Sequence, residues 1–145
     1  MDESFYREWF KGFSDSIDEM KAESRSLLLK HCAMRCADSG VMERYEQHFQ
    51  KVHGERDAFY LQLDELGGVR GEVIIPNKEY LVIFPKCLCD LHISGGVNTP
   101  NLCECSRQSI LYVNEKIWGK HQCVVECTGT ILSGEDECRF KVIYC

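Results

Sequence analysis

Two Cys-x-Cys pairs are the part of this sequence best suited to carry chemistry. Cys87 and Cys89 precede a loop that contains Gly, Asn and Pro, and Cys103 and Cys105 follow that loop. Four thiolates can bind one zinc ion tetrahedrally or hold an iron–sulfur cluster. The spacing therefore predicts a cysteine-rich metal site, with zinc as the cofactor and an iron–sulfur cluster as the alternative.

A third pair of thiols lies in the N-terminal part of the chain. Cys32 and Cys36 are four residues apart, so they lie one turn apart on one face of a predicted helix. They continue the line of Leu28, which indicates a face turned toward the interior. Such thiols can be small buried side chains, or they can replace one member of each Cys-x-Cys pair as ligands. The candidate metal ligands are therefore Cys32, Cys36, Cys87, Cys89, Cys103 and Cys105.

The same cysteines allow a thiol-dependent hydrolase or redox enzyme as an alternative. Cys105 stands at the start of a predicted helix capped by Ser106, where the helix dipole favours a thiolate. Cys105 would be the nucleophile, with His92 or His31 as the base and Glu126 orienting that base. No spacing in the sequence joins these residues, so the catalytic set stays open. A small-molecule sensor or carrier, whose ligand lies between the long helix and the sheet, is a third possibility.

Apolar periodicity predicts an α+β fold, with N-terminal helices packed on an antiparallel sheet made of two hairpins separated by a helix. Helices are expected over residues 3–12, 15–37, 41–52, 55–66 and 107–118, and strands over 72–76, 80–85, 122–132 and 138–144. We expect one domain spanning 1–145, with a helical half over 1–68 and a hairpin-helix-hairpin half over 69–145.

Composition and charge indicate which classes of partner and which cellular compartment to expect. The 145-residue chain carries a net charge of −6 with its basic residues scattered, which argues against direct binding to nucleic acid. No apolar run is long enough to span a membrane, and the acidic start does not resemble a secretory signal, so a cytoplasmic protein is expected. Ten cysteines are then expected to be reduced. A small-molecule ligand and a homodimer are the expected partners.

The end of the chain carries a resemblance to a known family. Glu126, Gly134, Cys138 and Phe140 stand in a pattern of Glu followed by Gly-x-x-x-Cys-x-Phe. This pattern resembles the 4-vinyl-reductase-type ligand-binding domains, whose relatives include haem-NO-binding sensors and transport-particle subunits. It is also similar to bacterial proteins of the 2-amino-thiazoline-4-carboxylate hydrolase-like group, and the paired thiols resemble a Cys-rich bacterial branch. The resemblance implies a ligand-binding fold. Many of those domains have a cysteine where this chain has Thr130.

Overall fold

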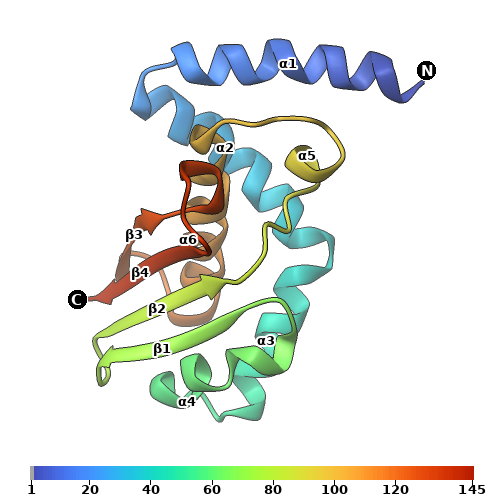
Figure 1. Cartoon of the computed structure of the whole chain (residues 1–145). Helices are drawn as coiled ribbons and strands as arrows, with labels where there is room; N and C mark the ends of the chain where they lie inside the picture. Colours follow the sequence, from blue (N-terminus) through green and yellow to red (C-terminus); the bar gives the residue numbers. More distant parts are fainter. Residues whose placement is uncertain (1) are drawn as a thin grey trace.

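The N-terminal half of the chain is helical, and the C-terminal half supplies the sheet (Figure 1). The structure is a computed structural model and describes residues 2–145. The helices are α1 (Glu3–Glu19), α2 (Ala22–Cys36), α3 (Met42–Lys51), α4 (Arg56–Leu61), α5 (Asp90–Ile93) and α6 (Glu104–Trp118). The predicted α+β class is confirmed.

Four antiparallel strands form a single sheet in the order β1-β2-β4-β3. The strands are β1 (Arg70–Ile75), β2 (Glu79–Phe84), β3 (Cys123–Gly129) and β4 (Cys138–Tyr144). Each predicted hairpin is present, and the two join where Val82 of β2 pairs with Phe140 of β4. Asn77 turns the first hairpin with φ 61°, a left-handed conformation that Asn tolerates well. Both residues of the central pair are buried, so the seam between the hairpins belongs to the core.

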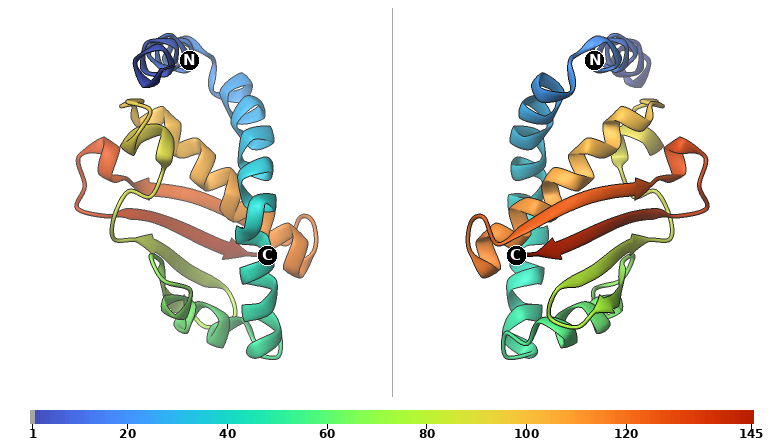
Figure 2. Two further views of the ribbon diagram at one scale, coloured as in Figure 1. Left: turned by 90° about the vertical axis from the view of Figure 1, so that its right-hand side faces the viewer. Right: turned by 90° about the vertical axis from the view of Figure 1, so that its left-hand side faces the viewer.

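The helices form two layers on one face of the sheet. Figure 2 shows α6 lying against the strands, with α2 and α3 on the far side of α6. The main core lies between the sheet and α4, α6 and α3, and its largest fully buried side chains include Tyr60, Tyr80 and Phe140. A smaller core joins Ile17 of α1 to Val97 and Leu102 in the segment that leads into α6.

The first helix is longer than its glycine suggests. We expected a helix that ends at Gly12 and a second that begins near 15, but α1 continues to Glu19 and the chain turns at Met20 and Lys21. Gly12 has no atom near the position of a Cβ, so it costs only its own propensity, about 1 kcal/mol. The turn is held instead by Arg25, which donates to the carbonyl oxygens of Ile17 and Met20, each at 2.8 Å.

The buried face of α2 is rotated by one residue from the prediction. Leu29, Ala33 and Ala37 are buried, whereas Cys32 and Cys36 are exposed. Small side chains explain the difference, because alanine lets α2 approach α6 closely and the apolar Leu28 then remains outside. The prediction of an inward face is therefore wrong for Cys32, whereas Cys36 is exposed but borders the cavity between α2 and the sheet.

The helix that follows the loop between the two Cys-x-Cys pairs begins earlier than predicted. Thr99 caps a short 3-10 turn over Pro100–Cys103, and that turn leads directly into α6 at Glu104. The Glu104 carboxylate then accepts a hydrogen bond from Ser26 of α2 at 2.9 Å. Cys105 therefore lies inside the first turn of α6, and Ser106 is a helical residue rather than the cap.

Candidate functional site

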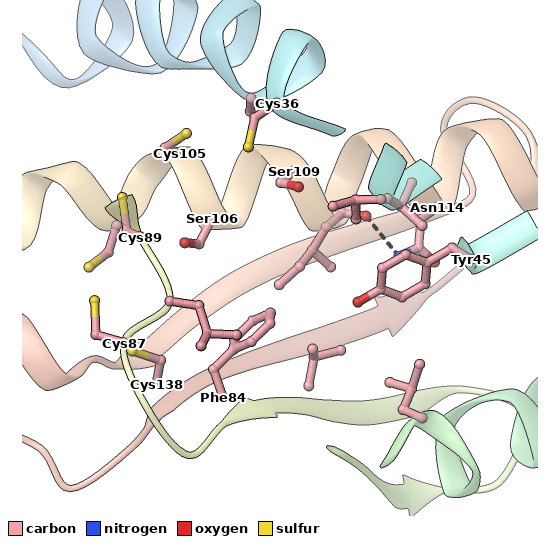
Figure 3. A pocket seen from close by; sticks show the side chains of 18 of the residues that line it. Cys36, Tyr45, Phe84, Cys87, Cys89, Cys105, Ser106, Ser109, Asn114 and Cys138 are labelled. Atoms are coloured by element: carbon pink, nitrogen blue, oxygen red, sulfur yellow. Dashed lines mark hydrogen bonds between the residues drawn. The ribbon is translucent and has the colours of Figure 1, made fainter. Parts of the chain in front are cut away.

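A cavity of about 280 Å³ lies between the sheet, α6, and the helices α2 and α3. Figure 3 shows the cavity from close by. Its walls come from α2, α3, α4, β2, the segment after β2, α6 and the start of β4, so segments that are distant in the sequence meet there. The lining includes Ala33, Cys36, Val41, Tyr45, Phe59, Tyr60, Leu63, Val82, Phe84, Lys86, Cys87, Leu88, Cys89, Leu102, Cys103, Cys105, Ser106, Ser109, Ile110, Val113, Asn114, Leu132 and Cys138.

The middle of the cavity is apolar. Phe84 and Val82 of β2 face Ile110 and Val113 of α6 across it, and Leu63 completes this wall. Packed interiors hold few voids larger than a water molecule, and an apolar void does not bind water well. The cavity is therefore suited to an apolar occupant.

Six cysteines gather at one end of the cavity, which we call the thiol end. They are Cys36, Cys87, Cys89, Cys103, Cys105 and Cys138. The prediction that α2 and the two Cys-x-Cys pairs share one site holds for Cys36, whereas Cys32 is not part of the lining. The thiol end forms where β2 leads to Cys87 and where α6 places Cys105 on the cavity wall (Figure 3).

Burial favours the protonated form of Cys89, Cys103 and Cys105. It raises the pKa of Cys105 to about 12 and that of Cys103 to about 11, and it also raises the pKa of Cys89. Neighbouring sulfurs add to the effect at Cys105, because a second negative charge nearby would be unfavourable. Desolvation is therefore the main influence on the pKa of Cys105 and disfavours its thiolate.

The prediction of a metal-binding domain is also wrong. Across residues 2–145, no group of three or more His, Cys, Asp or Glu side chains is arranged to hold a metal ion. The thiols line a shared cavity wall rather than converge on one point, which the spacing along the chain could not reveal. Neither a zinc site nor an iron–sulfur site is supported by this arrangement.

The residues proposed for a thiol enzyme are not brought together. His31 and Glu126 are exposed, and Nδ1 of His92 lies 2.9 Å from the carbonyl oxygen of Val97. None of these three residues lines the cavity that Cys105 lines. With no base beside it and a raised pKa, Cys105 is not an activated nucleophile.

The opposite end of the cavity is polar and was not predicted from the sequence. We call it the tyrosine end, formed by Tyr45, Tyr60 and Asn114. The side-chain oxygen of Asn114 accepts a hydrogen bond from the Tyr60 hydroxyl at 3.1 Å, and a second one from Tyr144. In the sequence, Tyr45 stands with Met42 and Phe49 on the apolar face of the helix predicted over 41–52. A phenol on such a face was the one available signal that the cavity has a polar end.

Charge is almost absent from the lining. Lys86, which is exposed beside Cys87, is the one charged residue among those that line the cavity. The tyrosine end has no positive or negative side chain in its lining. A charged group placed there would lose its hydration without gaining an ionic partner, which is costly.

Among solved structures, the chain has distant likenesses. No family model matches the chain, and no curated protein matches it. A crystal structure of trafficking protein particle complex subunit 3 from Naegleria fowleri, covalently bound to palmitic acid, aligns over 99% of this chain and 94% of that chain. The identity is 12% and the TM-score 0.44, which is too distant to assign a family or a function. The resemblance to 4-vinyl-reductase-type domains remains a prediction. Within the described part of the chain, no helix has the length and apolarity to cross a membrane.

Proposed function

We propose that this protein binds a small, mostly apolar molecule in the cavity between α6, α2, α3 and the sheet. The observation that carries the proposal is the apolar cavity itself, with a volume of about 280 Å³, close to the smallest ligand pockets of proteins. Elements from both halves of the chain build its walls, and a few polar groups stand at its ends. This combination is typical of ligand pockets rather than of packing defects.

The energetics support an occupied cavity. Transferring apolar ligand surface from water into the cavity is favourable by about 25 cal/mol per Å². Leaving the space empty forfeits dispersion contacts along its apolar wall. A ligand that binds only the folded state therefore also stabilises the fold.

The neutral fluorophore N-phenyl-1-naphthylamine tests this proposal, because its emission rises in apolar surroundings. Ser109 lies on the cavity wall and its hydroxyl makes no hydrogen bond within the described chain, so a larger side chain there can fill the space. We expect saturable binding to the natural protein, at least about tenfold weaker binding to Ser109→Trp, and unchanged binding to the matched control Ser109→Ala. Equal binding to both variants, each shown to be folded by circular dichroism, would contradict the proposal.

We also infer that a second copy of this chain covers the free part of α1. Side chains from Asp2 to Trp9 are exposed, and Phe5 and Trp9 are 49% and 58% accessible. This part of α1 projects beyond the rest of the molecule (Figure 1). Phe5 and Trp9 continue an apolar stripe of α1, and Ile17 is the buried end of that stripe.

Charge complementarity favours a second copy over an anionic surface. Helix α1 has five acidic and two basic side chains, whereas α2 has three basic and one acidic. The outer face of α2 also exposes Leu27 and Leu28. In a twofold dimer, α1 of each copy can therefore pack its aromatic residues on the basic, leucine-bearing α2 of its partner.

A further inference from the structure

The hydroxyl of Tyr45 is the polar group of the cavity that most clearly lacks a partner within the protein. Tyr45 projects from α3 into the cavity with its hydroxyl directed toward Phe84 (Figure 3). That hydroxyl makes no hydrogen bond to any residue from 2 to 145. Burial raises the pKa of Tyr45 to about 12, so the phenol is protonated at neutral pH. The Tyr45 oxygen is not among the side-chain atoms closed off from solvent, so it borders the open space of the cavity and can donate to a molecule bound there.

The neighbouring amide adds a second polar group to the same end. The Asn114 oxygen is occupied by the phenols of Tyr60 and Tyr144. The Asn114 nitrogen donates one hydrogen to the carbonyl oxygen of Ile110 at 2.9 Å, so its other hydrogen has no partner in the described structure. The tyrosine end thus offers donors, while its own acceptor is already used.

The charges of the lining restrict the group that these donors can bind. The lining's lone cation is Lys86, which directly precedes Cys87 of the thiol end in the chain. A carboxylate at the tyrosine end would be a buried charge without an ionic partner, which is unfavourable by several kcal/mol. A neutral oxygen avoids this penalty and still accepts a hydrogen bond.

Resting on the function proposed above, we propose that the ligand is a neutral amphiphile whose oxygen accepts a hydrogen bond from Tyr45. Its apolar part lies along Phe84, Val82 and Ile110 toward the thiol end. The ligand class is therefore a medium-chain ketone, aldehyde, ester or alcohol rather than a free fatty acid. Tyr45 is then the residue that selects the oxygen-bearing molecule from a plain hydrocarbon of the same length.

Displacement of N-phenyl-1-naphthylamine by two probes of equal chain length tests this assignment. The probes are 2-undecanone, which has a neutral acceptor, and undecanoate, which is anionic at neutral pH. We expect 2-undecanone to displace the fluorophore at lower concentration from the natural protein. In Tyr45→Phe, which keeps the ring but removes the donor, we expect 2-undecanone to bind about tenfold more weakly and undecanoate to be unaffected.

Tyr112→Phe is the matched control, because the Tyr112 hydroxyl donates to Asp38 at 2.8 Å and lies outside the cavity lining. Tighter binding of undecanoate than of 2-undecanone, or an unchanged ketone affinity in Tyr45→Phe, would overturn the assignment while leaving an apolar binding site intact. Failure of the fluorophore and both probes to bind the natural protein would instead overturn the proposed function and this assignment with it.

Discussion

The phenolic oxygens of Tyr60 and Tyr144 lie 2.7 Å apart, and both phenols hydrogen-bond to the side-chain oxygen of Asn114. The three residues come from α4, β4 and α6, and all three are buried. Their network therefore joins the sheet to α4 and α6 beside the cavity. It also fixes the position of the amide that stands next to Tyr45.

Replacing Asn114 with Ala should destabilise the fold by about 2 kcal/mol, because a buried phenol then loses its acceptor. Urea unfolding followed by circular dichroism measures this change. Tyr112→Phe removes an exposed hydrogen bond on the same helix and should change the urea midpoint little. An Asn114→Ala midpoint equal to that of the natural protein would show that the network is not structural.

The thiols should divide into fast and slow groups on alkylation. Cys32 and Cys145 are exposed, whereas burial raises the pKa of Cys105 to about 12 and also raises that of Cys89. Only the thiolate reacts, so iodoacetamide at pH 8 should modify the exposed pair first. The Cys105 rate should keep rising with pH up to about 12, because its thiolate fraction rises over that whole range.

Ligand in the cavity should protect the lining thiols selectively. Saturating N-phenyl-1-naphthylamine should slow the modification of Cys89 and Cys105 and leave Cys32 and Cys145 unchanged, as measured by peptide mass spectrometry. The exposed pair is the internal control for effects on the reagent. Modification of Cys105 as fast as that of Cys145 would show that this wall of the cavity is open to solvent.

The aromatic end of α1 should control the oligomeric state. Sedimentation equilibrium should give a dimer for the natural protein and a monomer for a Phe5→Lys, Trp9→Lys double variant, since the added positive charges would lie against the basic α2 of the partner. Ile74→Lys on the exposed sheet edge is the matched control and should stay dimeric. A monomeric natural protein would refute the dimer.

Local patterns predicted the elements well, because they depend on neighbouring residues. Alternation along Cys138–Tyr144 predicted β4, and the turn at Asn77 predicted the first hairpin. The end of α1 was misplaced because the hydrogen bonds of Arg25, rather than Gly12, decide where the helix stops. Such a tertiary contact leaves no local signal.

The site was harder to predict, because a cavity is defined by side chains that come from distant segments. The sequence grouped the thiols correctly around one loop and placed Cys36 near them. It could not show that the sulfurs line a wall instead of converging, because that depends on how the segment after β2, α2 and α6 pack in space. Tyr45 lies among apolar residues, so only the three-dimensional arrangement shows a hydroxyl without a partner.

Methyl chemical shifts test the central claim, binding inside the cavity, most directly. On titration with N-phenyl-1-naphthylamine, the largest changes should fall on Leu63, Val82, Ile110 and Val113, which line the cavity. The exposed methyl groups of Ile74, Ile75 and Val124 lie outside the lining and should not move. Changes confined to exposed methyl groups, or no changes at saturating fluorophore, would contradict a ligand-binding cavity.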